Sequence, residues 1–250
     1  MAGRAGLDAE LQAAAGRLSA SRRVLALTGA GVSAESGVPT FRGAEGLWRR
    51  FRPEDLATPE AFARDPKLVW QWYASRRERL APLRPNAAHE ALVALEARVP
   101  RFLLATQNVD GLHAAAGSRA MVELHGNIWR LRCMASCCRP REDRRVPLPE
   151  MPPRCSCGAL LRPDVVWFGE SLDETAVERA LQAAESAEVV LVIGTSSLVY
   201  PAAALPQVAR AHGAFVIEVN PQETPLTPSV DVSLRGKAAE LMPALLEASA

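Results

Sequence analysis

Polar side chains that could take part in catalysis follow two predicted buried strands. The strand at residues 102–106 leads into Gln107-Asn108-Val109-Asp110, and the strand at residues 121–124 ends at His125. Ligands meet an open α/β sheet at the carboxyl ends of its strands. Histidine changes its charge near neutral pH, so His125 is the candidate base, ahead of His89 and His113, because it directly follows a strand. The alternative is an Asn/Asp-rich turn beside structural histidines.

A glycine-rich turn follows another predicted strand, at residues 24–28. Gly29-Ala30-Gly31 and Ala34 have the G-x-G-x-x-G/A spacing of a dinucleotide-binding turn. Glycines there let the backbone approach a pyrophosphate, whose charge suits the N–H groups of a turn or helix start. The alternative is a tight strand-to-helix turn without a ligand. The acidic residue expected roughly 20 positions later is not evident, which argues against an ordinary dehydrogenase.

All five cysteines lie in one segment rich in proline and arginine, between residues 130 and 158. Two close pairs about twenty residues apart are typical of a structural zinc ion held by four thiolates. The spacing favours a set of four ligands, with Cys138 as the alternative to the second of them: Cys133, Cys137, Cys155 and Cys157. The competing interpretation is free thiols.

Tyr73 and Arg76 are three residues apart on a helix predicted between Pro66 and Pro82, and they share a face of it. Periodicity alone favours a solvated arginine beside a half-buried tyrosine. The same region has a helix start at Thr58, with Pro59 at the first helical position.

The remaining pattern alternates strands with helices, which predicts an α/β protein with a Rossmann-like, doubly wound parallel sheet. Leu7, Leu11 and Leu18 indicate an amphipathic leading helix. The further predicted elements are helices at residues 87–96 and 173–186, an extended segment at 162–170, strands at 189–193, 215–219 and 230–234, and a closing helix from residue 238. Several strands end in small or polar residues, among them Gly194-Thr195-Ser196 and Asn220.

Composition bounds the function classes. The chain has 250 residues, a net charge of +1 and 48% hydrophobic residues. A net charge this close to zero does not indicate binding to nucleic acid or to an anionic membrane. No apolar run is long enough to span a membrane, and the first residues lack a hydrophobic signal core. We therefore expect a cytoplasmic protein, with a core domain that carries a smaller inserted module.

Together these motifs resemble the sirtuin family of NAD-dependent protein lysine deacylases. The match covers nearly the whole chain after about residue 20, and several motifs appear in the family's order: Gly29 to Ser33, Gly37 to Arg42, Gln107 to Asp110, His125-Gly126, the paired cysteines, Val166 to Glu170, Gly194 to Ser196 and Asn220. The resemblance implies a discontinuous NAD-binding domain at residues 1–42, 86–129 and 158–250. It also implies a small domain made of a helical insertion at 43–85 and a zinc module at 130–157.

Within the family, the sequence is similar to class III members, which remove acidic acyl groups such as succinyl, malonyl and glutaryl. Tyr73-Ala74-Ser75-Arg76 matches their Tyr-x-x-Arg signature, and Ala57 matches a small residue that leaves space in the acyl pocket. Arg76 could hold a distal carboxylate, with a hydrogen bond from Tyr73. An acetyl group would leave a buried arginine unpaired.

The resemblance also implies a reaction in which NAD is consumed. The acyl oxygen attacks the ribose as nicotinamide leaves, and neutral His125 then acts as general base on a ribose hydroxyl, which closes onto the imidate. The products are lysine, nicotinamide and O-acyl-ADP-ribose. Asn108 lies at the nicotinamide ribose, Asp110 at the nicotinamide amide, and Phe41 and Arg42 in a loop that covers NAD.

The implied sites are assigned as follows. Residues implied to bind NAD are Gly29, Ala30, Gly31, Ser33, Thr40, Phe41, Arg42, Gln107, Asn108, Val109, Asp110, Gly194, Thr195, Ser196, Asn220 and Ala238. Residues implied to bind the substrate are Ala57, Tyr73, Arg76, Val166, Trp167, Phe168, Gly169 and Glu170, with the peptide added as a strand. The sequence departs from the family in its cysteine spacing and at Ala238, where some relatives place a different adenine contact.

Two other functions use the same features. A mono-ADP-ribosyltransferase would move ADP-ribose from NAD to protein. A non-catalytic NAD sensor or zinc-ribbon interaction module would have little need for a base at the ribose, so Asn108, Asp110 and His125 argue against it. We expect a monomer that acts on acyl-lysine proteins or peptides, without a nucleic-acid or membrane partner.

Overall fold

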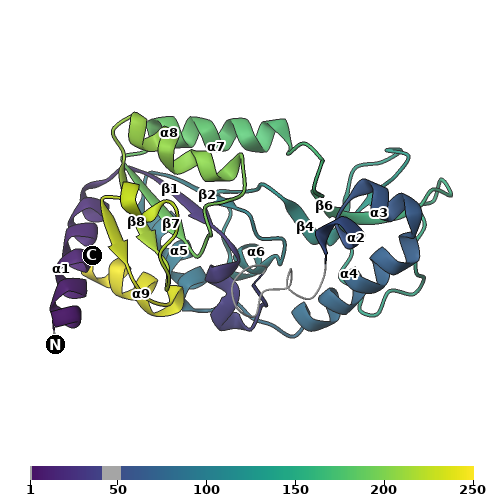
Figure 1. The fold of residues 1–250 in the computed structure, drawn as a ribbon, viewed down its shortest axis with the longest axis horizontal. Coiled ribbons are helices and arrows are strands. Elements are labelled where there is room, and N and C mark those ends of the chain that lie inside the picture. The colour runs from purple at the N-terminus through teal and green to yellow at the C-terminus, as the bar shows by residue number, and fades with distance from the viewer. Residues whose placement is uncertain (1, 41–51) are drawn as a thin grey trace.

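The computed structural model describes residues 2–40 and 52–250 and contains two sheets (Figure 1). The larger sheet has six parallel strands in the order β3-β2-β1-β7-β8-β9. Its strands are β1 (Arg23–Thr28), β2 (Arg101–Thr106), β3 (Met121–Glu123), β7 (Val189–Ile193), β8 (Phe215–Val219) and β9 (Val232–Leu234). Numbered along the chain, this order is 3-2-1-4-5-6, which is the doubly wound arrangement that the sequence predicted.

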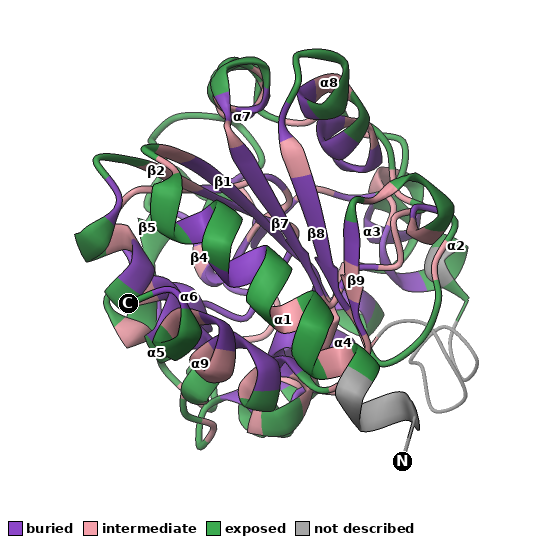
Figure 2. Cartoon of the chain, turned by 90° about the vertical axis from the view of Figure 1, so that its left-hand side faces the viewer, coloured by how far each residue is buried: buried purple, intermediate pink, exposed green. Residues whose placement is uncertain are grey.

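Helices cover both faces of this sheet (Figures 1 and 2). Alternate residues of β1 face opposite cores, since Val24 and Ala26 belong to one cluster and Leu25 and Leu27 to the other. The first core is closed by α1 (Ala2–Ala20), α5 (Ala87–Arg98) and α9 (Ala238–Ala248), and the second by α7 (Glu174–Ser186) and α8 (Leu205–Ala211). Leu18 of the predicted leading helix is buried, and Leu7 and Leu11 pack against the same core.

The second sheet has three antiparallel strands in the order β5-β4-β6. Its strands are β4 (Gly126–Cys133), β5 (Arg141–Glu142) and β6 (Leu161–Val165), and the helices beside it are α2 (Pro53–Leu56), α3 (Pro59–Arg64) and α4 (Pro66–Leu80). Residues 126–129 and 161–165 therefore belong to strands of the small sheet, although the sequence grouped them with the large domain. The division of the chain into domains stays a prediction.

Local sequence signals account for most helix starts. The Thr58 side chain accepts a hydrogen bond from Ala61 N at 3.1 Å, which confirms the predicted cap. Asn86 and His89 form a capping box at the start of α5 that the sequence analysis missed.

The remaining elements are α6 (Leu112–Ala116) and the 3₁₀ segments η1 (Ala30–Ser36), η3 (Ala202–Ala204) and η4 (Thr227–Ser229). Within the described ranges, no helix is long and apolar enough to cross a membrane.

Four cysteines converge where β4 ends. The Sγ atoms of Cys133, Cys137, Cys155 and Cys157 all lie within 4.8 Å of one another. Cys137 Sγ is 3.5 Å from both Cys133 Sγ and Cys155 Sγ. Thiolates at about 2.3 Å from a tetrahedral zinc ion would stand about 3.8 Å apart, so this set fits one structural zinc. Cys138 Sγ lies 3.8 Å from Cys155 Sγ but outside the group of four.

A buried polar layer lies beneath the carboxyl ends of β1 and β2. Thr28 Oγ1 donates to Thr106 Oγ1 at 2.8 Å and lies 3.0 Å from His113 Nε2. His89 Nε2 is 3.3 Å from Ser33 Oγ, and the two imidazole rings are 4.7 Å apart. Burial lowers the pKa of His89 to about 4. Burial, together with the neighbouring His89, lowers the pKa of His113 to about 3. Both histidines are therefore neutral at pH 7.

The zinc assignment predicts different outcomes for two adjacent cysteines. Cys137→Ser should lower bound zinc from about one ion per chain and lower the Tm, because it removes one of four thiolates. Cys138→Ser is the matched control and should keep both. Metal content by mass spectrometry and thermal unfolding measure the two effects. Equal zinc loss in both variants would contradict this ligand set.

The buried histidines predict acid destabilisation. Below about pH 6.5 His89 and His113 bind protons in the unfolded chain but stay unprotonated in the folded state. The unfolding free energy therefore falls as the pH falls. Two such histidines give a slope of up to about 2.7 kcal/mol per pH unit. Urea unfolding between pH 6.5 and 5 should show a smaller slope in His113→Gln. His212→Gln, a change at an exposed histidine, is the control variant. If the slope of unfolding free energy against pH were unchanged in His113→Gln, the assignment would be contradicted.

Candidate active site

The site begins where β1 and β7 lie side by side at the point where the strand order reverses. Gly29 N donates to Ile193 O at 3.0 Å, and Gly31 N donates to Gly194 O at 2.8 Å. A Cβ on Gly31 would lie 2.7 Å from the Gly194 Cα, and one on Gly194 would lie 2.3 Å from Val32 N. Glycine is thus required first by the contact between two strand ends, a reason that the sequence analysis did not give.

His125 is held in one tautomer by the backbone. Its Nδ1 lies 3.0 Å from Gln107 O, and a carbonyl oxygen can only accept, so Nδ1 carries the proton. The Nε2 atom is then an acceptor, as a general base requires. Burial lowers the pKa of His125, against the opposing effect of the hydrogen bond to Gln107 O. The imidazole is therefore neutral at pH 7.

Asn108 is positioned from two sides. Its backbone N–H donates to Thr106 Oγ1 at 3.1 Å, and its side-chain Nδ2 donates to Ser33 Oγ at 3.2 Å. Asp110 also receives a hydrogen bond from Ser33, and its Oδ1 accepts from Leu112 N at 2.8 Å. Burial raises the pKa of Asp110, and these hydrogen bonds oppose the rise. The buried layer thus extends directly to the predicted catalytic residues.

Thr195 joins three strand ends. Its hydroxyl accepts from Gln107 Nε2 at 2.9 Å, and its carbonyl accepts from Asn220 Nδ2 at 2.9 Å. These contacts link the ends of β2, β7 and β8. Residues predicted separately from three parts of the sequence therefore form one wall.

That wall lines a cavity of about 700 Å³, here named the central cavity. His125 is the only one of the three candidate histidines that lines it. The predicted residues that line it are Gly29, Ala30, Gly31, Thr40, Ala57, Tyr73, Arg76, Gln107, Asn108, Val109, His125, Val166, Trp167, Phe168, Gly169, Glu170, Gly194, Thr195, Ser196, Asn220 and Ala238. Ser33 and Asp110 are buried behind this wall. Phe41 and Arg42 lie outside the described residues.

Aromatic side chains surround the end of the central cavity at α4. Tyr73 is 1% exposed and so is fully buried rather than half-buried, as periodicity had suggested. Its hydroxyl accepts a hydrogen bond from Trp167 Nε1 at 2.8 Å. The Arg76 guanidinium lies 4.8 Å from the centroid of the Trp72 ring. Burial lowers the pKa of Arg76, while Tyr73 and Asp110 oppose this, and the guanidinium keeps its charge.

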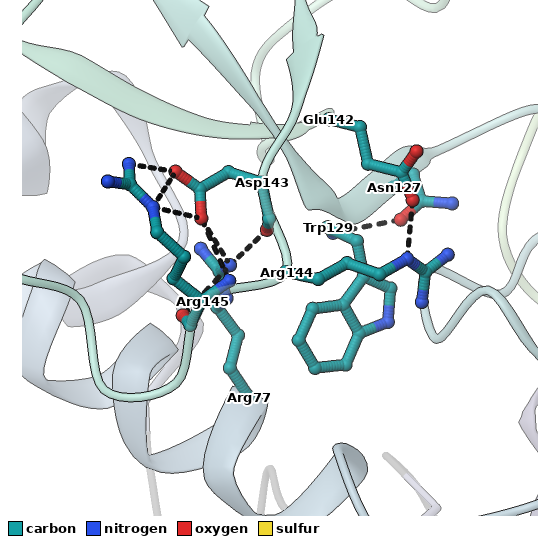
Figure 3. Close-up of polar contacts among 7 residues, drawn as sticks. All are labelled: Arg77, Asn127, Trp129, Glu142, Asp143, Arg144 and Arg145. Atoms are coloured by element: carbon teal, nitrogen blue, oxygen red, sulfur yellow. Dashed lines mark hydrogen bonds and ion pairs between the residues drawn. The ribbon is translucent and has the colours of Figure 1, made fainter.

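Arg77, the residue after Arg76, anchors α4 to the segment that follows β5 (Figure 3). Its Nη2 donates to the backbone oxygen of Asp143 and lies 3.3 Å from Asp143 Oδ1. Arg145 Nη2 pairs with the other carboxylate oxygen at 2.5 Å. The Arg77 guanidinium also lies 5.2 Å from the Trp129 ring centroid. The zinc module therefore helps to fix the helix that presents Tyr73 and Arg76.

The segment at residues 166–170 is braced by Arg162, which the sequence analysis missed. Arg162 pairs with both Glu170 oxygens, at 2.5 and 2.8 Å, and its guanidinium lies 3.4 Å from the Trp167 ring centroid. Nothing in the spacing of Arg162 and Glu170 indicates this pair.

Trp72 was also missed, although its position one helical turn before Arg76 could have revealed it. Val166 N donates to His125 O at 2.9 Å, which joins this segment to the candidate base.

Comparison with known proteins gives consistent matches. The Sir2 family model matches residues 29–201. The NAD-dependent protein deacylase of Aquifex aeolicus is 56% identical over 217 residues, which cover 86% of this chain and 90% of the relative. The enzyme of that name from Thermus thermophilus is 55% identical over 247 residues, covering 96% and 95%.

Solved structures agree with the sequence relatives. A Sir2 homologue in complex with NAD superposes with a TM-score of 0.87 at 51% identity, and the match covers 93% of this chain and 91% of that one. The family model spans the glycine turn, His125 and the cysteine cluster, and the relatives each cover more than four fifths of the chain. The chain belongs to the Sir2 family.

Proposed function

We propose that this protein is an NAD-dependent protein lysine deacylase that prefers acyl groups ending in a carboxylate, namely succinyl, malonyl and glutaryl. The observation that carries the proposal is the continuity of the central cavity. One cavity is lined by Gly31 and Asn220 on the large sheet, by His125 just before β4, and by Tyr73 and Arg76 on α4. A dinucleotide and an acyl-lysine could therefore meet at His125.

The NAD side of the proposal follows the strand ends. The turn at Gly29 and Gly31 takes the phosphates, and the adenosine lies toward Asn220 and Ala238. Bound NAD supplies the ADP-ribosyl group and the nicotinamide leaving group. A Sir2 homologue of similar structure was solved in complex with NAD, which supports NAD as the ligand. Asn108 is held at the ribose by Thr106 and Ser33, so its side chain is oriented before the ligand binds.

The proton acceptor is His125 Nε2. Its Nδ1–H is committed to Gln107 O, so Nε2 takes the proton of a ribose hydroxyl as that oxygen bonds to the acyl carbon. Water then releases the lysine, and the acyl group leaves on ADP-ribose. The overall change consumes acyl-lysine, NAD and water, and yields lysine, nicotinamide and O-acyl-ADP-ribose.

The acyl preference rests on the charge at the α4 end of the cavity. A guanidinium in a partly desolvated site binds a carboxylate strongly because both ions form charge-assisted hydrogen bonds. Ala57 leaves room beside it, and the segment at 166–170 lies along the cavity as an edge for the peptide backbone. An acetyl group offers nothing to Arg76, so it should react less efficiently.

Removing the base should abolish turnover without abolishing NAD binding. His125→Ala should lower kcat by about 100-fold or more, the usual contribution of a general base. Because the pKa of His125 is lowered by burial, kcat/KM in the parent enzyme should stay level above pH 6.5 and fall only in more acidic solution. Nicotinamide release across pH and calorimetric NAD titration measure these effects. Full activity in His125→Ala would refute the mechanism.

Removing the guanidinium should remove the acyl preference. In the parent enzyme, kcat/KM should be higher for a succinyl-lysine peptide than for the matched acetyl-lysine peptide, by about 10-fold or more. Arg76→Met should bring the two values together by lowering the succinyl value. Arg79→Met, an exposed change on the same helix, is the control and should keep the ratio. Equal efficiencies in the parent enzyme would refute the acyl preference and leave deacylation standing.

Labelled NAD separates deacylation from mono-ADP-ribosylation with the same proteins. Adenine-labelled NAD should yield label in O-acyl-ADP-ribose, in proportion to the lysine released. Label attached to protein would instead support the transferase.

A further inference from the structure

We propose that Trp167 is a positioning residue for acyl selectivity, which directs the hydroxyl proton of Tyr73 toward the distal carboxylate of the acyl group. This inference rests on the proposed preference for acidic acyl chains and names a residue that tunes it. The two side chains come from parts of the chain that are 94 residues apart, and they meet through a single hydrogen bond at 2.8 Å.

The direction of that hydrogen bond is fixed by chemistry. An indole N–H is a donor only, whereas a phenol oxygen can both donate and accept. Trp167 Nε1 must therefore donate, and the Tyr73 oxygen must accept. One lone pair of the phenol is occupied, so its own O–H must point away from the indole. Tyr73 lines the central cavity, where an acyl group would present an acceptor.

The phenol also keeps its proton. Burial raises the pKa of Tyr73, and this effect exceeds the opposing influence of Arg76 and of the Trp167 hydrogen bond. Arg76, three residues later on α4, has only donors. Tyr73 and Arg76 thus offer donors to the same end of the cavity. A carboxylate accepts two or more hydrogen bonds there, and an acetyl methyl group accepts none.

Trp167 is itself held firmly, so it can fix the orientation of another group. Its side chain is 2% exposed and its ring lies 5.3 Å from that of Phe62. The Arg162 guanidinium covers the indole, and Trp167 N donates to Glu170 Oε2 at 2.8 Å. The indole cannot rotate away from Tyr73 without breaking its ring contacts with Phe62 and Arg162. One side chain therefore connects the proposed peptide-binding segment to acyl recognition.

A double-mutant cycle tests the inference. The proteins are the parent, Trp167→Phe, Tyr73→Phe and the double variant, each assayed for kcat/KM with matched succinyl- and acetyl-lysine peptides. Phenylalanine keeps an aromatic ring against Arg162 and removes the indole N–H. Trp70→Phe is the matched control, because it also removes a buried indole hydrogen bond on α4, but one from Trp70 Nε1 to Leu161 O at 2.8 Å and not to the Tyr73 hydroxyl.

The expected result is a loss of selectivity that depends on Tyr73. Trp167→Phe should lower the succinyl-to-acetyl ratio by about 10-fold, whatever its effect on both activities together. The double variant should show no lower ratio than Tyr73→Phe alone, and Trp70→Phe should keep the parent ratio. An unchanged ratio in Trp167→Phe, or losses that multiply in the double variant, would overturn the inference. Absence of any preference in the parent would instead refute the proposed function.

A second measurement examines the hydrogen bond directly. It needs neither an activity assay nor a substitution of Trp167. In ¹⁵N-labelled protein, the indole N–H signal of Trp167 should move upfield in Tyr73→Phe, because that change removes only its acceptor oxygen. The signal of Trp70 should stay in place. An unmoved Trp167 signal would show that the hydrogen bond does not form in solution and would overturn the inference.

Discussion

The close contact between the ends of β1 and β7 is the constraint on which the site depends. Gly31 and Gly194 approach so closely that a Cβ on either would meet the backbone of the other turn. This contact lets Gly31 N donate to Gly194 O and brings Thr195 within reach of Gln107 and Asn220. Three strand ends thereby become one rigid wall, which can orient a ligand without rearranging.

Beneath that wall lies a layer of polar side chains that carry no charge, which avoids the free-energy cost of burying an ion. Thr28, Thr106, Ser33 and two histidines contact one another in a buried layer, although His113 Nδ1 has no hydrogen-bond partner among the described residues. Protonating either ring would leave a buried charge, so both imidazoles are neutral. The same logic applies at His125, where a backbone carbonyl selects the tautomer and burial keeps the ring neutral. The fold itself therefore prepares His125 for the proposed role of base.

The opposite side of the cavity is organised by cations that are held in place by aromatic rings and carboxylates. Arg162 is fixed by Glu170 and by Trp167, and Arg77 by Asp143 and by Trp129. Arg77 joins α4 to the segment after β5, whereas Arg162 holds residues 167–170 against the strand that precedes them, and Trp167 reaches α4 through Tyr73. Arg76 lies at their junction, beside Trp72, which is where a site for an anionic group requires a cation with a fixed direction.

Sequence alone determined the doubly wound sheet, the pairing of cysteines in one segment and the positions of His125 and Asn108 after strand ends, because periodicity, cysteine spacing and strand ends are local properties of the chain. The Tyr73 and Arg76 pair was also visible as a helical spacing. Only the tertiary structure decided that β4 and β6 form a separate sheet, that the glycines serve a strand contact, and that Trp167 donates to Tyr73. Those features depend on contacts between residues far apart in the sequence, and no local pattern encodes which distant side chain will satisfy a buried donor or charge.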